Sequence, residues 1–435
     1  MSNRKHVENI NSDTYTEKSM TGIHVVAKPI GPVCNLNCEY CFYLEKEALF
    51  APGEQYRMSD AVLAAFINNY VASQPTPEVA FVWQGGEPTL FGIDFFQKVI
   101  ELQRPFRGLK QISNAIQTNG TLLTDEWCSF LKKNNFMVGI SLDGPREIHD
   151  RYRRDRAGNG SFDKVMRGLK LLQKHGVDYN VLASVAHDTA KHPLEIYRFF
   201  KDHGIEFIQF APIVERLPDK VSRMHGLRLA GPAALGRVEE EIGVTPWTVD
   251  AESYGDFLIA IYEEWVRYDV GKIFVMNFEW ALNAWIGNSS PVCIHAKTCG
   301  RSLVMEHNGD VYACDHHVYP EYRLGNIITG SLNDMAEKSE RAGFGIAKES
   351  ALPRWCRECD VLAACQGGCP KHRFAKTYYD EPGLQYLCTG YNKFFLHIRK
   401  YLRAMTQLLE HGQPASYIMD AINGPLVIKL DKQSK

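Results

Sequence analysis

Apolar residues along the first half of the chain follow two alternating spacings. Short apolar runs rich in Val, Ile and Phe predict strands, and they lie at 23–28, 78–84, 111–120, 136–144, 179–186 and 206–213. Between them, apolar positions recur every three or four residues, as on one face of a helix. These segments lie at 59–72, 93–106, 123–134, 161–176 and 193–204. Ser59 is suited to cap the first helix and Gly176 to end the fourth.

This β–α alternation predicts a parallel sheet covered by helices. The periodicity fits an open sheet or a partial barrel equally well. Because Val, Ile and Phe occupy both faces of the predicted strands, we expect both faces of the sheet to be covered. In either architecture, ligands bind at the carboxyl ends of the strands. Polar residues that follow these strands are therefore the first candidates for a functional site.

The second half of the chain has a different organisation. Residues 214–254 are irregular and are expected to connect two domains, and helical spacing returns at 255–268, 277–286 and 393–412. A length of 435 residues also favours more than one domain. The expected division is a polar N-terminal arm (1–21), an α/β core (22–213), a connecting segment with helices (214–289), a cysteine-rich domain (290–392) and a C-terminal helix and tail (393–435).

Composition narrows the class of protein. The net charge is −2, with 45% hydrophobic and 23% charged residues, so neither nucleic acid nor an anionic membrane is an expected partner. No apolar run is long enough to span a membrane, and the polar N-terminus lacks the apolar region of a secretory signal. We therefore expect a cytoplasmic protein, monomeric by default. Twelve cysteines in a reducing compartment indicate metal or iron–sulfur ligation rather than disulfides.

Three of these cysteines lie in the stretch "CNLNCEYCFY", directly after the first predicted strand. Cys34, Cys38 and Cys41 have the spacing C-x3-C-x2-C, which lets one loop surround a cluster. Three thiolates leave one iron of a four-iron cluster open to a small ligand. A zinc site completed by a distant residue is the alternative, and the spacing alone does not exclude it.

The stretch resembles the signature of the radical S-adenosylmethionine (SAM) enzymes, with Tyr40 as its aromatic position. The resemblance implies a partial (β/α)6 barrel and a [4Fe-4S] cluster whose open iron binds SAM. One electron from the cluster then yields a 5′-deoxyadenosyl radical, which abstracts a substrate hydrogen. "QGGEP" (84–88) and "SLDGP" (141–145) follow further strands. The resemblance implies cofactor contacts at Gly85, Gly86, Glu87, Ser141, Asp143, Arg153 and Val214. A solvated basic run around Arg153 and plain core at Val214 are the alternatives.

Eight further cysteines lie between residues 293 and 388, enough for two sets of four thiolates. Two zinc sites or two iron–sulfur clusters would suit them equally. The order "GDVYAC", C-x2-C-x5-C-x3-C and a final Cys resembles the SPASM domain, which carries two auxiliary [4Fe-4S] clusters. The resemblance implies interleaved ligation, with Cys293, Cys299, Cys314 and Cys369 in one set and Cys356, Cys359, Cys365 and Cys388 in the other. Cys128 stands alone in a helical pattern and is expected to be buried as a small apolar residue.

Over roughly residues 22–400 the chain resembles the anaerobic sulfatase-maturating enzymes. "WQGGEPTL", "QTNGTLL", "GISLDGP", "GDVYACDHHV" and "RLGNI" carry this resemblance together with the cysteines. It implies oxidation of a Cys or Ser in a C/S-x-P/A-x-R segment of a sulfatase to Cα-formylglycine. Asp315 would be the base that takes the side-chain proton, and an auxiliary cluster would take the electron. A flavodoxin or ferredoxin would be the electron donor. A turn aspartate is the alternative for Asp315, and local structural roles are expected for His316 and His317.

Two other functions remain open from the sequence. The first is a different SPASM enzyme, one that crosslinks or epimerises a ribosomally made peptide. Many such enzymes begin with a leader-binding domain, and the polar stretch before the first strand is too short for one. The second is a non-catalytic iron–sulfur or zinc protein, which the three-cysteine motif beside "QGGEP" disfavours.

Overall fold

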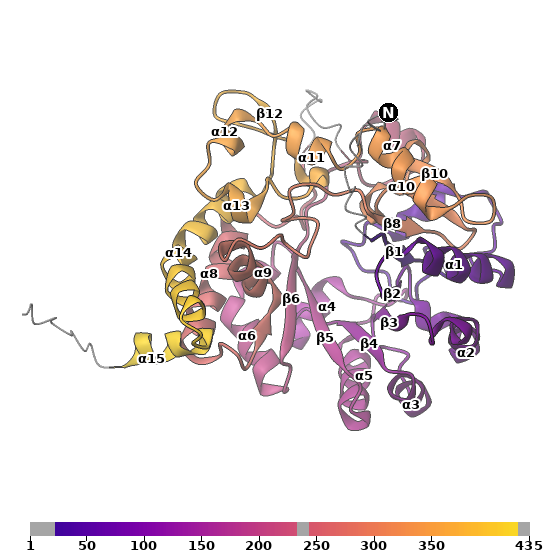
Figure 1. The fold of residues 1–435 in the computed structure, drawn as a ribbon, viewed down its shortest axis with the longest axis horizontal. Helices are drawn as coiled ribbons and strands as arrows, with labels where there is room; N and C mark the ends of the chain where they lie inside the picture. The colour runs from indigo at the N-terminus through magenta and orange to yellow at the C-terminus, as the bar shows by residue number, and fades with distance from the viewer. Residues whose placement is uncertain (1–21, 233–242, 425–435) are drawn as a thin grey trace, which may run out of the picture.

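The computed structural model describes residues 22–232 and 243–424. Its main feature is one ten-stranded sheet in the order β10-β9-β8-β1-β2-β3-β4-β5-β6-β7, which curves as seen in Figure 1. The strands β1 to β7 are parallel neighbours. They span His24–Ala27, Glu78–Trp83, Gln111–Thr118, Phe136–Ser141, Tyr179–Val185, Phe207–Pro212 and Phe274–Val275. The predicted six-fold β–α alternation is confirmed, and β7 adds a short strand at the edge of the sheet.

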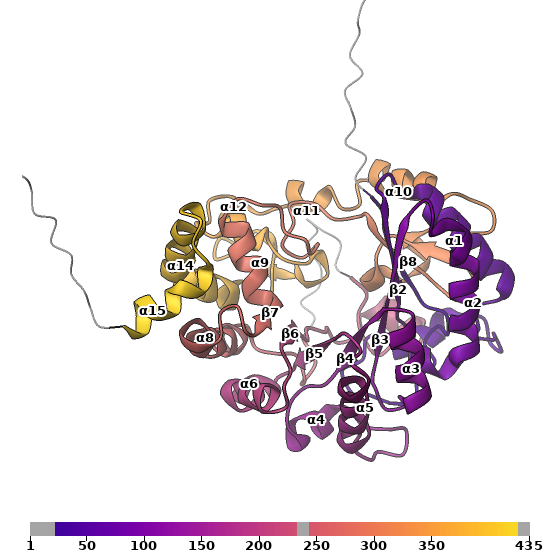
Figure 2. The ribbon, with the colours of Figure 1, turned by 60° about the horizontal axis from the view of Figure 1, so that its bottom comes forward.

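Helices cover the outer face of these strands (Figure 2). They are α1 (Asp60–Ser73), α2 (Ile93–Gln103), α3 (Asp125–Lys133), α4 (Arg146–Tyr152), α5 (Phe162–His175) and α6 (Pro193–Asp202). Ser59 caps α1 through a hydrogen bond from the Val62 amide, and Gly176 ends α5 in the left-handed conformation, both as predicted. Trp83 packs edge-to-face between Phe66 and Phe96, so aromatic packing joins β2 to α1 and α2.

The opposite face of the sheet is less covered than the sequence predicts. Along β2, Val79, Phe81 and Trp83 are fully buried, whereas Glu78 and Ala80 are exposed. The same alternation exposes Gln111 and Ser113 on β3. Because the barrel is incomplete, no layer formed by residues 22–232 or 243–424 packs over the inner face at these strand beginnings. The expectation that both faces are covered is therefore wrong for β2 and β3.

The cysteine-rich region is joined to the barrel by strand pairing that the sequence pattern did not predict. β8 (Ser302–Met305) lies parallel to β1, with Val25 opposite Leu303. β9 (Asp310–Tyr312) and β10 (Arg323–Asn326) continue the sheet in antiparallel fashion. β9 runs back antiparallel from the end of β8, and Asp315, in the turn after β9, contacts Lys28 at the carboxyl end of β1.

Helices and short strands form the remaining part of the structure. They are α7 (Lys220–Met224), α8 (Ala251–Tyr268), α9 (Met276–Trp285), α10 (Leu332–Arg341), α11 (Ala347–Ser350), α12 (Arg354–Arg357), α13 (Leu362–Cys365), β11 (Ala375–Lys376), β12 (Pro382–Leu384), α14 (Cys388–Glu410) and α15 (Ile418–Asn423). The long C-terminal helix thus begins at Cys388 rather than at the predicted residue 393. The predicted arm, residues 1–21, lies outside the described residues. Within the described part of the chain, no helix has the length and apolar character needed to cross a membrane.

Helices α8 and α14 cross so closely that only glycine fits between them. A Cβ atom on Gly390 would lie 1.8 Å from the Ala251 carbonyl oxygen, and one on Gly255 would lie 2.6 Å from the Gly390 oxygen. We expect Gly390→Ala to lower the free energy of unfolding by about 2 kcal/mol, because overpacking forces the two helices apart. Thermal denaturation measures the effect. Gly108→Ala is the control, since a Cβ there has no heavy atom within 4 Å. Equal melting temperatures would contradict this crossing.

Candidate functional site

A cavity of about 380 Å³ lies between the carboxyl ends of the barrel strands and the cysteine-rich domain. From the barrel, the predicted site residues on its wall are Cys38, Tyr40, Cys41, Arg153 and Val214. From the cysteine-rich domain they are Asp315 and Cys369. Residues from separate predictions therefore meet in one cavity. Residues Gly85, Gly86, Glu87, Ser141 and Asp143 are not on this wall and lie behind it.

The "QGGEP" loop supports the chain just before the first cysteine. The amide of Gly86 donates to the Gly31 oxygen at 2.8 Å, and the amide of Glu87 donates to the Val33 oxygen at 2.9 Å. A Cβ on Gly86 would lie 1.9 Å from the Val33 oxygen, so no other residue fits. Gly85 has a φ of +134°, which also favours glycine. The two glycines thus let two backbone loops approach each other.

Polar side chains at the ends of β2, β3 and β4 are satisfied within the protein. The buried Glu87 carboxylate accepts hydrogen bonds from the Thr118 hydroxyl at 2.7 Å and the Asn119 amide at 2.7 Å. Burial raises the pKa of Glu87, and these hydrogen bonds oppose the rise. Ser141 accepts a hydrogen bond from the Gln117 amide group at 3.2 Å. Glu87 and Ser141 therefore fix the strand ends beneath the cavity.

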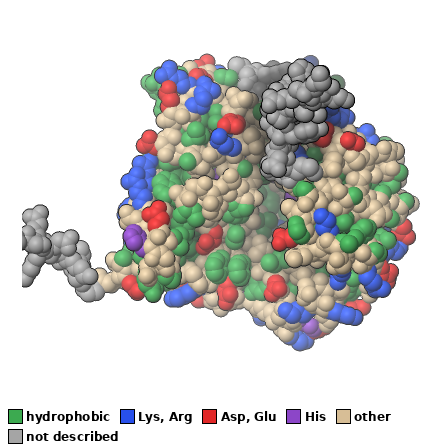
Figure 3. Space-filling view, in the orientation of Figure 1, with side chains coloured by type: hydrophobic (Ala, Val, Ile, Leu, Met, Phe, Trp, Pro, Cys, Tyr) green, Lys and Arg blue, Asp and Glu red, His purple; other side chains and the backbone are tan. Residues whose placement is uncertain are grey.

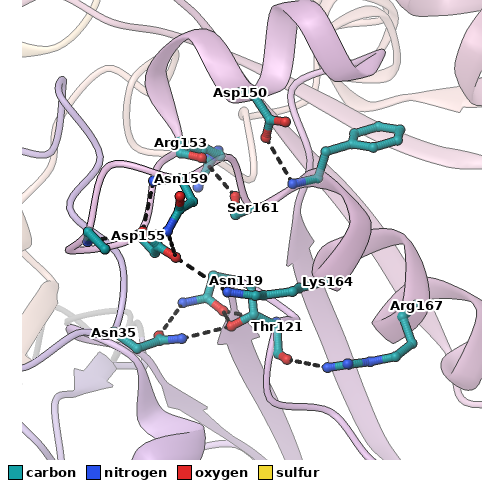
Figure 4. Close-up of polar contacts among 12 residues, drawn as sticks. Asn35, Asn119, Thr121, Asp150, Arg153, Asp155, Asn159, Ser161, Lys164 and Arg167 are labelled. Atoms are coloured by element: carbon teal, nitrogen blue, oxygen red, sulfur yellow. Dashed lines mark hydrogen bonds and ion pairs between the residues drawn. The ribbon is translucent and has the colours of Figure 1, made fainter.

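A second network holds the cysteine loop from the side of β3 (Figure 4). The Asn35 amide group donates to the Thr121 hydroxyl at 2.8 Å, and the Asn119 amide group donates to the Asn35 side-chain oxygen at 2.9 Å. Arg167 donates to the Thr121 carbonyl oxygen at 2.8 Å. The sequence pattern singled out "TNG" (118–120) at the end of the third predicted strand, but not Asn35, Thr121 or Arg167. The loop is therefore held rigidly before any ligand binds.

Asp143 organises the wall of the cavity through two side chains. Its Oδ2 atom accepts a hydrogen bond from the Tyr40 hydroxyl at 2.6 Å and pairs with Arg153 Nε at 2.9 Å. Its Oδ1 atom accepts a hydrogen bond from the Ser184 amide at 2.8 Å. Arg153 is 7% exposed, whereas Arg151 and Arg154 beside it are exposed. The alternative of a solvated basic run is therefore wrong for Arg153, which faces the cavity.

The three thiols of the first motif lie together in a largely apolar surrounding, packed with Tyr40 and Tyr152. Burial raises the pKa of Cys38 to about 12; the Arg153 guanidinium opposes the rise, and the nearby Cys41 and Cys34 thiols add to it. Three neighbouring buried thiols become thiolates only when a cation compensates their charge. This donor set fits a [4Fe-4S] cluster, in which three thiolates would leave one iron open to a further ligand.

Asp315 reaches the cavity from the turn after β9. Its carboxylate forms an ion pair with Lys28, which is buried at the carboxyl end of β1. The Lys28 ammonium lies 3.4 Å from the ring centre of Tyr43, whose hydroxyl donates to Glu306 at 2.8 Å. Sequence reasoning missed Lys28 and Tyr43. A charged residue at the end of an apolar strand was the available signal for Lys28.

The histidines after Asp315 have different surroundings. His316 lies on the cavity wall with its Nδ1 atom 3.6 Å from the Cys369 sulfur. His317 is buried between the rings of Tyr322 and Phe344, which is a structural position. A further ion pair, between Lys371 and Glu215, also lines the cavity and joins the cysteine-rich domain to the barrel. Neither member of this pair was predicted from the sequence.

Eight further thiols lie in the cysteine-rich domain, and the resemblance assigns them to two interleaved sets of four. Burial raises the pKa of Cys299 to about 11, and the charges of Cys293 and Cys369 contribute to the rise. Burial raises the pKa of Cys314 well above its usual value, and the charges of Cys369 and Cys293 contribute to the rise. In the second set, burial raises the pKa of Cys388 to about 12, with contributions from Cys365, Cys356 and Cys359. Cys128 is fully buried in α3, as predicted.

By number, each set of four thiols suits a zinc ion or an iron–sulfur cluster. Among the described residues, no three His, Cys, Asp or Glu side chains are grouped closely enough to hold a single metal ion. The second set instead surrounds a hollow at the protein surface. One set, through Cys369, borders the cavity, and the other lies farther out.

Comparisons with known proteins agree with this geometry. Residues 29–200 match the family model of the Radical SAM superfamily, and residues 293–360 match an iron–sulfur cluster-binding domain, SPASM. The serine-type anaerobic sulfatase-maturating enzyme of Bacteroides thetaiotaomicron is 47% identical over 94% of this chain and 97% of its own. The cysteine-type enzyme of Clostridium perfringens is 32% identical over 86% of this chain and 96% of its own.

A solved structure gives the same result for the fold. Native anSMEcpe with bound AdoMet and Cp18Cys peptide superimposes with a TM-score of 0.76 at 31% identity, covering 89% of this chain and all of that one. The resemblance stated from the sequence is confirmed, and so is the fold class of a partial barrel followed by a SPASM domain. The chain therefore belongs to the anaerobic sulfatase-maturating enzymes, which are radical SAM oxidoreductases with an iron–sulfur cluster-binding SPASM domain.

Proposed function

We propose that this enzyme oxidises one Cys or Ser side chain in a C/S-x-P/A-x-R segment of a sulfatase polypeptide to Cα-formylglycine. The observation that carries the proposal is the shared cavity. Its wall includes Cys38 and Cys41 of the first motif, the carboxylate of Asp315, and Cys369 of one auxiliary set. A substrate side chain in this cavity would meet a hydrogen-abstracting centre, a base and an electron acceptor together.

The residues around the cavity have distinct roles in this proposal. Cys34, Cys38 and Cys41 would hold the SAM-binding [4Fe-4S] cluster, and the two interleaved sets would hold the auxiliary clusters. When bound, SAM and this cluster supply the radical chemistry that removes a Cβ hydrogen atom from the substrate. Tyr40 and Arg153, fixed by Asp143, would orient the cofactor at the cavity wall, and Val214 would pack against it.

Asp315 would accept the proton from the substrate thiol or hydroxyl. Lys28 fixes the position of this carboxylate, because its buried ammonium group is paired with it. The cluster that the set containing Cys369 would hold borders the same cavity and would accept the one electron that the substrate still has to give up. A one-electron carrier of the flavodoxin or ferredoxin type would supply the electron that starts each turnover.

The relatives do not decide between a cysteine and a serine substrate. Serine-type and cysteine-type enzymes both match nearly the whole chain, at 47% and 32% identity. A thiol loses its proton much more easily than a hydroxyl, so a base at Asp315 would deprotonate a Cys side chain more readily than a Ser side chain. We therefore expect both peptides to be oxidised, the Cys peptide faster.

The test is an anaerobic reaction with matched peptides. Reconstituted enzyme, SAM and dithionite are incubated with peptides that contain C-x-P-x-R, S-x-P-x-R or A-x-P-x-R, and the peptides are weighed by mass spectrometry. Conversion of Cys to formylglycine removes one sulfur and two hydrogen atoms and adds one oxygen atom, which lowers the mass of the peptide. Conversion of Ser removes two hydrogen atoms. The Ala peptide should stay unchanged. Release of 5′-deoxyadenosine without any change in the Cys and Ser peptides would refute this substrate class.

A further inference from the structure

Three large aromatic side chains are exposed together on the cysteine-rich domain. Trp355, Tyr378 and Tyr379, which we name the aromatic patch, are 45%, 87% and 72% exposed. Tyr379 links the other two, with ring centres 6.2 Å from Trp355 and 5.4 Å from Tyr378. Exposed aromatic residues that adjoin one another mark interaction surfaces in soluble proteins. The patch lies on α12 and the turn between β11 and β12, at the outer end of this domain in Figure 1.

The protein holds the two tyrosines outward on a well-bonded turn. The Thr377 amide donates to the Glu381 oxygen at 2.8 Å, and the Asp380 amide donates to the Thr377 oxygen at 3.0 Å. The Thr377 hydroxyl accepts a hydrogen bond from the Glu381 amide at 3.1 Å. The turn is thus closed by its own backbone and Thr377, without help from either tyrosine ring. Folding of this turn does not explain the aromatic side chains at its tip.

The patch adjoins the thiol set that lies away from the reaction cavity. Trp355 precedes Cys356 and lines one surface hollow with all four thiols of that set, Cys356, Cys359, Cys365 and Cys388. None of these four is on the wall of the central cavity, which is bordered by Cys369 of the other set. The space-filling view in Figure 3 shows this domain as a lobe beside the hollowed centre of the molecule. The second set is therefore accessible from outside, at the patch.

The proposed oxidation leaves one electron that must exit the protein. Conversion of CH2–XH to CH=X removes one hydrogen atom, one proton and one electron from the substrate. The hydrogen atom leaves on the cofactor and the proton goes to Asp315. We propose that the aromatic patch is the docking surface for a one-electron carrier protein, which takes up this electron through the set of Cys356, Cys359, Cys365 and Cys388. This inference rests on the proposed function, and the carrier is reduced by one electron per turnover.

The charges around the patch favour contact through aromatic area. Arg354 pairs with Glu358 at 2.7 Å, and Lys376 pairs with Asp380 at 2.9 Å. These neighbours neutralise each other and leave the rings as the main feature of the surface. Tyr and Trp are the side chains that most often dominate the binding energy at protein interfaces. Loss of the two tyrosines should therefore remove a large part of the affinity.

The experiment measures carrier binding directly on the reconstituted enzyme. Oxidised bacterial flavodoxin and an oxidised bacterial [4Fe-4S] ferredoxin are titrated separately into wild-type enzyme and a Tyr378→Ser/Tyr379→Ser double variant, without peptide. We expect at least one carrier to bind, with Kd raised about tenfold or more in the double variant. Tyr268→Ser is the matched control, since Tyr268 is 55% exposed on α8, and its Kd should equal that of wild type.

Each other outcome has a defined meaning. Equal carrier affinity in wild type and the double variant, or no binding of either carrier to wild type, would overturn the docking surface. Loss of self-association in the double variant, with carrier binding unchanged, would assign the patch to a contact between copies of this chain and also overturn it. Dithionite-driven peptide oxidation needs no carrier, so the double variant should retain it. Carrier binding that depends on the tyrosines, without peptide oxidation in wild type, would refute the proposed function alone.

Discussion

Replacement of Cys34, Cys38 and Cys41 by alanine will reduce cleavage of SAM to the background seen without enzyme. The cysteine loop brings the three thiols together, with Cys38 and Cys41 on the cavity wall, and such a set holds a cluster only as thiolates. Without it, no electron reaches the sulfonium of SAM. Release of 5′-deoxyadenosine under dithionite, measured by chromatography, gives the result without any peptide substrate.

Two further measurements make this result specific. Iron analysis should show a loss of about four iron atoms in the triple variant, with the auxiliary iron retained. Cys128→Ala is the matched control, because Cys128 is fully buried in α3 and belongs to none of the three sets. It should cleave SAM at the wild-type rate. Undiminished 5′-deoxyadenosine release from the triple variant would remove the first motif from its assigned role.

The sequence predicts those parts of the structure that depend on patterns among residues close together in the chain. Apolar spacing locates the six strands and their helices because each pattern reports one element and its buried face. The barrel strands β1 to β6 lie within about two residues of their predicted limits at nearly every end. The cysteine sets are predicted on a different basis, because the resemblance rests on fixed spacings between the cysteines of each motif.

The parts that were missed depend on contacts between distant residues. Nothing in the residues 302–326 indicates that β8 pairs with β1 rather than forming a separate sheet. That pairing places Lys28 beside Asp315, two residues that lie far apart in the sequence. The close approach of Gly86 to the Val33 oxygen, the atom nearest to where a Cβ would lie, also joins two loops that are distant in the sequence. The exposed Glu78 and Ala80 on β2 likewise follow from the open barrel, which no local pattern records.

Asp315→Asn should leave SAM cleavage intact and lower formylglycine formation by about a hundredfold or more, the usual contribution of a positioned base. The amide has nearly the shape of the carboxylate but cannot take up the substrate proton. The measurement is the molar ratio of formylglycine peptide to 5′-deoxyadenosine in one reaction. Asp310→Asn is the control, because Asp310 lies on the neighbouring β9 and pairs with Arg323 instead. Its ratio should match that of wild type.

The ratio separates a base from an aspartate that only shapes the turn. A turn aspartate would accept hydrogen bonds from nearby backbone amides, whereas the partner found for Asp315 is the Lys28 ammonium, brought in by β1. Removing a structural aspartate would weaken the fold around Cys314 and reduce both products together. Removing a base stops the reaction after the hydrogen atom has left, so 5′-deoxyadenosine accumulates alone. A normal ratio in Asp315→Asn would therefore move the proton acceptor to another side chain on the cavity wall.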